Sequence, residues 1–477
     1  MQKKIFFLFF MVTALHSYAQ DANYWSSNYG VGGFLAPGAT IAKNGDSGVL
    51  FYNPALLAYN TKNAASISGN VYDLHTTIIK NGAGTGLHLK STNASVVPVI
   101  VANTIYLKLK RPITFAYALV NNPVMNFDAS QRKDEHQNVL NDSYSPGNEL
   151  FVGQYVLSNF ISETTGMLAF ANQLSSKLAL GISLGINVRK QTYLSDFSSK
   201  TLINDASSLH QKLVTSSEFY LSNNLTVGLG IRMGFSYDLA PRHHIGVVTS
   251  LPTIQLYGSG DLLTDFSISN LQLRTTELFL FASGKQTKLK ASWKTPLSVA
   301  AGYTYDFRRA QIYFAVEYFG KINEYNVVQP RNEKFIRPDT GYVSGFTSRI
   351  LRLKDKHKPV VNFALATSFP IRDKVRGYCS LRTNFNYLRS DILSNEEGYR
   401  SSTGIWDMYH MQVGANFKKR KFNLRTGILL SYGSSGKYMQ DVNFDNANED
   451  NYLAGDIHTT RATRISAGLM LAYIYNF

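Results

Sequence analysis

An alternation of apolar with small or polar residues recurs along this chain, and it constrains the fold more than any other feature. The stretch "RISAGLMLAYIYNF" (464–477) is apolar at every second residue: Ile465, Ala467, Leu469, Leu471, Tyr473, Tyr475 and Phe477. Successive side chains of a strand point to opposite faces, so one face of this strand is apolar throughout. Such a strand invites aggregation in water, whereas a closed barrel in lipid requires it.

The same pattern returns in "KLALGISLGINVR" (177–189), "LTVGLGIRMGFSYDL" (225–239) and "PLSVAAGYTYDF" (296–307). In each of them the second face carries glycine or alanine, and in two of them it also carries an arginine. Inward glycines either leave room in a lumen or let another segment approach the wall closely. An inward arginine in a lipid-embedded strand needs a wet or paired lumen.

Period and turn signals predict about fourteen strands. Their centres are expected near Val71, Val101, Ala118, Leu157, Leu184, Ile231, Val248, Val299, Phe314, Phe363, Leu381, Val413, Thr426 and Leu471. Short connections alternate with long polar ones. The short ones are 110–112, 174–177, 240–243, 307–310, 370–374 and 418–421. The long ones lie near 79–92, 124–149, 194–217, 258–292, 321–357, 391–405 and 434–462.

Short turns at one rim and long loops at the other are typical of outer-membrane barrels, whose short turns are periplasmic. The fold class is therefore expected to be all-β, with 63–477 forming a transmembrane antiparallel β-barrel of about fourteen strands with long extracellular loops. An even strand count places both termini in the periplasm.

The N-terminal and compositional features agree with export to an outer membrane. Residues 1–20 combine Lys3 and Lys4 with a short apolar run and small residues, as a secretory signal peptide does. No run of about 18 apolar residues follows, so helical membrane spans are not expected. Cys379 is the only cysteine, so no intramolecular disulfide forms. Tyrosine and phenylalanine, 29 of each, suit two interfacial girdles.

The formal net charge of +16 bears on the partners. An exported chain without a basic cluster is a poor ligand for nucleic acid. Anionic lipid head groups of the outer membrane of a Gram-negative-type bacterium are the expected counter-charge. The C-terminal strand ending in Phe477 predicts recognition by the barrel-assembly machinery.

Residues 21–62 lack strand periodicity and are predicted to form a plug, or hatch, inside the lumen. Asn53 before Pro54 suits a turn, and Pro54 suits the first position of a short helix. A disordered leader is the alternative, but the segment is more apolar than disordered segments usually are. Its apolar candidates for ligand contact are Phe34, Leu35, Phe51, Leu56 and Leu57.

The stretch "NGDSGVLFYNPALLA" (44–58) resembles the plug motif of the FadL/TodX outer-membrane transport proteins, where small residues lead into "NPA". The likeness continues in order through "SVVPVIVANTIYLKLKRPITFAYALVNN" (95–122), "GFSYDLAPRHHIGVVTSLPTIQLYGSGDL" (234–262) and the "P-x-x-x-x-G-x-x-Y" strand in 296–307. It implies a 14-stranded barrel with an N-terminal hatch, and passive uptake of long-chain fatty acids or other hydrophobic small molecules. Asn53, Pro54 and Ala55 match the plug motif.

The resemblance also implies a lateral gap beside a kinked third strand, where Asn121, Asn122 and Pro123 stand in this sequence. Pro123 removes a ladder donor, so a kink or bulge is expected there. The alternative is that Pro123 begins the following loop. A second candidate site is the apolar cluster Leu278, Phe279, Leu280 and Phe281, which suits a ligand-capture surface or, alternatively, an outward extension of a barrel strand.

Sequence motifs for catalysis are missing: no zinc-protease helix, nucleophile elbow or paired-cysteine site occurs. His243 and His244 are adjacent, so they point opposite ways on a strand and are expected to be solvated turn residues rather than metal ligands. We expect no enzyme activity, no cofactor and no metal. The alternative to transport is a PorV-like barrel that scaffolds or shuttles secreted proteins, and an open porin is disfavoured by the apolar N-terminal segment.

Overall fold

The computed structural model of the chain describes residues 23–25, 36–43, 49–60, 63–107, 113–204, 212–273, 276–333, 335, 347–388, 398–419 and 421–476. The predicted signal peptide, Phe34, Leu35 and Phe477 lie outside these residues.

The described chain is almost entirely strand, with short helical turns. The helical elements are α1 (Val49–Tyr52), η1 (Pro54–Tyr59), α2 (Thr347–Ile350) and η4 (Glu449–Asn451). The strands are β1 (Ala64–Ile79), β2 (Leu89–Leu107), β3 (Ile113–Gln137), β4 (Glu149–Gln173), β5 (Leu178–Leu202), β6 (Leu213–Ala240), β7 (His243–Ser250), β8 (Ile254–Leu273), β9 (Thr276–Ala291), β10 (Ser298–Phe307), β11 (Ala310–Phe319), β12 (Ile322–Gln329), β13 (Leu353–His357), β14 (Val360–Arg372), β15 (Val375–Asn384), β16 (Tyr399–Arg400), β17 (Met408–Lys418), β18 (Phe422–Met439) and β19 (Thr459–Asn476). Among the described residues, no helix has the length and apolar character needed to cross a bilayer.

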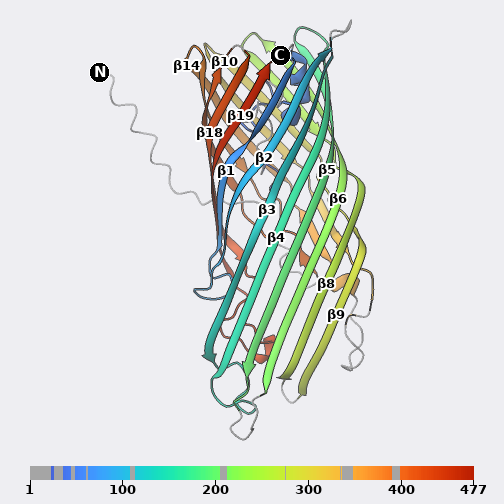
Figure 1. The fold of residues 1–477 in the computed structure, drawn as a ribbon, viewed down its shortest axis with the longest axis vertical. Helices are drawn as coiled ribbons and strands as arrows, with labels where there is room; N and C mark the ends of the chain where they lie inside the picture. The colour runs from blue at the N-terminus through green and yellow to red at the C-terminus, as the bar shows by residue number, and fades with distance from the viewer. Residues whose placement is uncertain are drawn as a thin grey trace, which may run out of the picture.

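The strands form a closed 14-stranded antiparallel barrel (Figure 1). Closure is made by β1 and β19, which pair antiparallel from Ala64↔Asn476 to Ile79↔Ala462. Interruptions divide some barrel strands into two named pieces, so that β7 continues as β8 and β9 continues as β10. Every predicted strand centre lies in a described strand, and the predicted fold class is confirmed.

The alternation observed in the sequence separates the two faces of the wall. On β5, Leu180, Ile182, Leu184, Ile186 and Val188 are exposed, while Ala179, Ser183 and Arg189 are buried on the inner face. An exposed apolar outer band of this kind is the surface that lipid requires.

The loops predicted at 124–149, 194–217 and 258–292 are wrong in whole or in part, because β3, β4 and β5 each run for 25 residues and β6 for 28. Long connections do lie at two other predicted places, between β1 and β2 and between β18 and β19. At about 3.3 Å per residue and a tilt of roughly 40°, 25 residues rise about 60 Å, well beyond an apolar band of about 25 Å. Figure 1 shows β3–β6, β8 and β9 running to the end of the barrel opposite the C terminus. Above the membrane both faces of a strand meet water or polar neighbours, so the alternation fades and the sequence resembles a loop.

The end of the barrel opposite the C terminus, which we call the crown, includes the β1–β2 connection, the end of β3 and the β18–β19 connection. Asp445 links these three parts. The Thr85 N–H donates to the Asp445 carboxylate at 2.6 Å, and Lys133 Nζ lies 3.1 Å from it. Partial burial raises the pKa of Asp445, but these hydrogen bonds and the Lys133 charge outweigh burial, so the pKa lies below its usual value of 3.8. The carboxylate therefore stabilises the crown in its charged form.

This pKa shift predicts a pH-dependent crown. A lowered pKa contributes stability that is present above pH 3.8 and is lost as the pH falls through the lowered value. We expect the Thr85 amide to exchange hydrogen more slowly in the native protein than in Asp445→Asn at pH 6, and the difference to shrink as the pH falls below 3.8 and the carboxylate becomes protonated. Asp450→Asn, on exposed η4, is the control and should match the native protein; equal exchange in all three proteins at pH 6 would contradict the prediction.

Candidate functional site

The N-terminal segment 49–60 is anchored to the barrel through Asn53. Asn53 Oδ1 accepts a hydrogen bond from the Ala55 N–H at 3.0 Å and caps η1, whose first residue is Pro54. Asn53 Nδ2 donates to the carbonyls of Ile41 at 2.8 Å and Phe235 at 3.0 Å. The turn and short helix predicted at "NPA" are therefore confirmed, and the same asparagine ties the segment to β6.

Small residues on the inner face of the wall form the seat of this segment. A Cβ added at Gly234 would lie 2.1 Å from Asn53 Oδ1, and one at Gly181 would lie 2.4 Å from the Pro54 carbonyl carbon. Gly246 and Gly302 approach Ile41 in the same way. Leu50, Leu56 and Leu57 pack against a set of inward alanines: Ala102, Ala116, Ala118, Ala169, Ala171 and Ala179. Inward glycines were predicted either to leave room in the lumen or to let another segment approach the wall closely, and these glycines do the second.

A charged network holds the preceding residues. Lys43 Nζ lies 2.5 Å from Asp306 Oδ2 and 2.8 Å from His244 Nε2, and His244 also pairs with Asp238. His244 is buried, so the prediction of a solvated turn histidine is wrong for it. The reason is that Lys43, distant in sequence, brings a partner into the lumen. His243 points the other way, to the Tyr303 hydroxyl at 2.6 Å. The described residues contain no group of three or more His, Cys, Asp or Glu placed to hold a metal ion.

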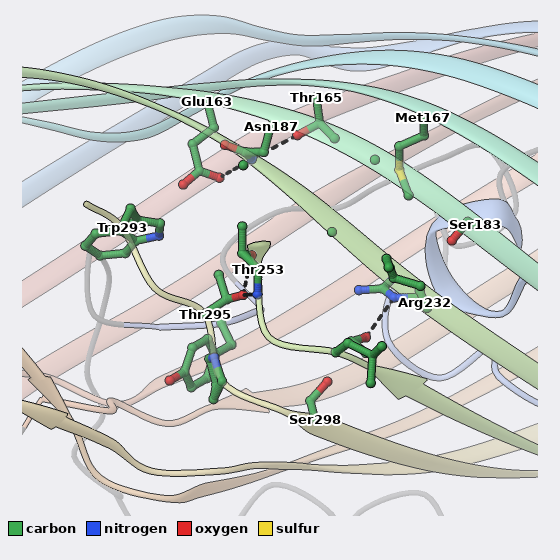
Figure 2. A pocket seen from close by; sticks show the side chains of 18 of the residues that line it. Glu163, Thr165, Met167, Ser183, Asn187, Arg232, Thr253, Trp293, Thr295 and Ser298 are labelled. Carbon is green, nitrogen blue, oxygen red and sulfur yellow. Dashed lines mark hydrogen bonds between the residues drawn. The ribbon is translucent and has the colours of Figure 1, made fainter. Parts of the chain in front are cut away.

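A cavity of about 270 Å³ lies inside the barrel beside the N-terminal segment (Figure 2). Its apolar lining comes from Tyr24, Phe51, Met167, Val227, Ile231, Leu251, Trp293, Pro296 and Phe319. Its polar lining comes from Glu163, Thr165, Ser183, Asn187, Thr226, Arg232, Ser250, Thr253, Gln255, Thr295 and Ser298. Glycines 185, 228 and 230 complete it. This lumen pocket suits a molecule with both an apolar and a polar part.

One side of the lumen pocket has its charges neutralised. Glu163 forms an ion pair with Arg189, whose guanidinium lies 3.5 Å from the centre of the Trp293 ring. Asn187 Nδ2 donates to Thr165 Oγ1 at 3.0 Å and more weakly to Glu163 at 3.4 Å, as Figure 2 shows. The Glu163 carboxylate thus balances the Arg189 charge, and the guanidinium packs on the indole of Trp293.

Arg232 is the exception. Its Nε donates to Ser250 Oγ at 3.0 Å, and no carboxylate of the described residues pairs with it. Ser183, directly opposite Arg232 in the β5–β6 ladder, has a buried hydroxyl without a hydrogen-bond partner among the described residues. A buried polar atom without a partner and an uncompensated guanidinium, side by side, favour an anionic or strongly polar ligand group.

The predicted ligand residues separate in the structure. Phe51 lines the lumen pocket. Leu56 lines another cavity, of about 390 Å³, beside Lys43, and Leu57 lies in the packed core. The polar residues of the pocket were not predicted individually, although Arg232 and Asn187 stand at inward positions of the alternating stretches, where a polar residue on a lipid-embedded strand indicates a lumen contact.

The third-strand residues Asn121, Asn122 and Pro123 lie within β3, so the interpretation that Pro123 begins a loop is wrong. The β3–β4 register shifts between Pro123 and Met125. The β2–β3 ladder runs from Leu107↔Ile113 to Ile100↔Val120 and goes no further.

The cluster at 278–281 lies in β9 and alternates along the strand. Phe279 and Phe281 are exposed, whereas Leu278 and Leu280 pack against the main core. The strand extension predicted as an alternative is thus present, and a capture role remains a prediction.

The seat of the N-terminal segment can be tested with Gly234→Val. The added methyl groups would collide with Asn53 and displace the segment. We therefore expect trypsin to cleave the purified protein after Lys43 or Lys62 at least about tenfold faster, because local opening exposes such sites. The measurement is the rate of N-terminal clipping by intact-mass spectrometry.

Gly166→Val on β4 is the matched control, because a Cβ there meets nothing within 4 Å. Equal resistance of the two variants to trypsin would show that the glycine seat does not hold the segment.

Comparison with known proteins gives likenesses of structure only. No family model matches the sequence, and no curated protein matches it. The toluene transporter TodX of Pseudomonas putida is 14% identical with a TM-score of 0.56, covering 94% of this chain and 98% of that chain. A Pseudomonas aeruginosa FadL homologue is 11% identical with a TM-score of 0.54, covering 97% and 100%. The toluene transporter TbuX of Ralstonia pickettii is 12% identical with a TM-score of 0.54, covering 94% and 99%. The chain thus has the fold of the FadL/TodX transport proteins, as its sequence resemblance predicts.

Proposed function

We propose that this protein is a FadL/TodX-type channel of the outer membrane that takes up hydrophobic molecules carrying an anionic or polar group, of which long-chain fatty acids are the best match. The observation that carries the proposal is the lumen pocket, where an apolar lining meets Arg232, which has no paired carboxylate among the described residues. An apolar solute gains about 25 cal/mol per Å² of surface that it removes from water, so a pocket of this kind binds it better than a water-filled pore does.

In this proposal the N-terminal segment is the plug, and the short turns and both termini are periplasmic. The segment's side chains fill the lumen against β3–β6, with Leu50, Leu56 and Leu57 almost completely buried. A barrel of this size without such a segment would be an aqueous channel. Transport is passive, and it uses no cofactor or metal.

Lateral release into the bilayer is part of the proposal, beside Asn121, Asn122 and Pro123. Beyond Val120 side chains replace the β2–β3 ladder: Asn93 Nδ2 donates to the Asn126 carbonyl at 2.9 Å. Phe279 and Phe281 remain the proposed capture surface. A scaffold for secreted proteins needs no internal pocket, so the lumen pocket supports transport over that alternative.

The Arg232 guanidinium gives the decisive test. We expect Arg232→Met to weaken binding of dodecanoate by about 10- to 100-fold, because hydrogen bonds to a charged group contribute about 1.5–3 kcal/mol. Binding of dodecanol should change less than about threefold. The measurement is calorimetric titration of the protein in a detergent without acyl chains, with mass spectrometry of co-purified lipids to identify the natural ligand.

Arg132→Met is the control, since Arg132 is exposed in the crown and paired with Asp134 at 2.7 Å. If neither compound binds the native protein and no apolar molecule co-purifies with it, the scaffold function becomes the better explanation. If Arg232→Met weakens the binding of dodecanoate and of dodecanol equally, the guanidinium is not the head-group site.

A further inference from the structure

The barrel wall contains a break in its backbone ladder between 251–258 and 291–297, which we call the seam. The β7–β10 ladder ends at Ser250↔Ser298. The β8–β9 ladder begins again at Ser259↔Lys290. Between these pairs, the described residues show no backbone hydrogen bond across the boundary of the two strands.

The break is confined to this one boundary, because both strands remain attached to their outer neighbours. On one side, the Leu251 N–H donates to the Ile231 carbonyl of β6 at 2.9 Å. On the other, the Ser292 N–H donates to the Val327 carbonyl at 2.8 Å, and the Gly320 N–H to the Leu297 carbonyl at 2.9 Å. The two strands are therefore held in place while the line between them is unpaired.

Side chains bridge the seam where the backbone does not. Thr253 and Thr295 lie with their hydroxyl oxygens 2.5 Å apart, and Thr295 Oγ1 also accepts from the Thr253 N–H at 3.1 Å. Gln255 accepts from the Trp293 N–H at 3.2 Å and donates to the Ala291 carbonyl at 3.1 Å. These contacts need only rotations of side chains to open, whereas a backbone ladder would need the strands to separate.

Two prolines explain why the ladder breaks here. Pro252 and Pro296 stand opposite each other in the two strands and have no N–H to donate. Irregular backbone at membrane depth is tolerated where it lines a protein cavity rather than lipid alone. The seam satisfies this condition, because Leu251, Thr253, Gln255, Trp293, Thr295 and Pro296 all line the lumen pocket.

The outer side of the seam faces the apolar band. Ile254 and Leu256 are exposed on one strand, and Leu297 and Val299 on the other. Ser250 is the last of the 8 residues of β7, which starts at a short turn. Eight residues rise about 20 Å at a tilt of roughly 40°, within an apolar band of about 25 Å. The seam thus begins in the half of the band farther from the turn.

The lumen pocket reaches this break and not the one beside β3. Its described lining comes from Tyr24, Phe51, β4, β5, β6, the strands on both sides of the seam and Phe319 of β11, and it includes no residue of β2 or β3. Figure 2 shows Thr253 and Thr295 joined at the edge of the cavity, across from Glu163 and Asn187.

We propose that the seam is a lateral opening through which an amphipathic molecule passes between the lumen pocket and the hydrocarbon of the outer half of the membrane. The proposal rests on the proposed function. The hydroxyl groups of the two seam threonines and the amide of Gln255 supply transient partners for a polar head group. The two prolines of the seam supply an apolar edge for the tail. In the closed seam, the Thr253–Thr295 contact and the contacts of Gln255 bridge the two strands.

The test is a disulfide across the seam, made by Thr253→Cys and Thr295→Cys in a Cys379→Ser background. Oxygens 2.5 Å apart place two sulfur atoms at those positions within reach of a bond of about 2.05 Å. We expect oxidation to lower uptake of labelled dodecanoate into cells at least about tenfold, and a reductant to restore the rate that the same variant had before oxidation. Binding of dodecanoate to the purified oxidised protein should persist.

A matched disulfide, Thr249→Cys with Val299→Cys, joins the same two strands where their ladder is intact. It should leave uptake unchanged when oxidised. Full uptake through the oxidised seam would overturn the proposal and assign release to the β2–β3 break. No dodecanoate binding or uptake by the reduced protein would instead reject the proposed function, so the two failures are distinguishable.

Discussion

The whole structure depends on one constraint: within hydrocarbon, backbone N–H and C=O groups must find partners inside the protein. The antiparallel ladder meets it strand by strand, and the β1–β19 pairing closes the circle so that no edge is left. Two of the places where the ladder stops among the described residues, between β2 and β3 and at the seam, are bridged by polar side chains. The positions of these breaks decide where the wall can open without unfolding.

The inner face follows from the same constraint. Because the wall supplies its own backbone partners, its inward side chains are free to be small, and the N-terminal segment packs against inward glycines and alanines. The segment in turn must satisfy its own polar groups. Asn53 does so by bonding to Phe235 and Ile41, and Lys43 by meeting Asp306. Hydrogen bonds and charge thus fix the segment, while apolar burial fills the volume.

The sequence predicted the membrane-level barrel well, because lipid outside and a lumen inside impose a period of two on every strand. The short helix at Asn53–Ala55 followed from the chemistry of asparagine and proline. Most strand extensions beyond the membrane were missed, since water on their outer face removes the apolar signal, and the one at 278–281 was predicted only as an alternative. The lumen pocket was predicted only in part: Phe51 came from an apolar segment, whereas Arg232 and Ser183 are brought together only by strand register. The burial of His244 was unpredictable because its partner Lys43 lies 201 residues away.

The place of Phe51 outside the strands has a consequence for how barrels of this fold can diversify. One end of the lumen pocket is made by a residue that belongs to no strand, so its size can change without disturbing a single ladder hydrogen bond. A mutation at this position alters the space in the lumen pocket while every strand of the wall keeps its sequence. At this position the lining of the pocket and the pairing of the wall can therefore change independently of each other.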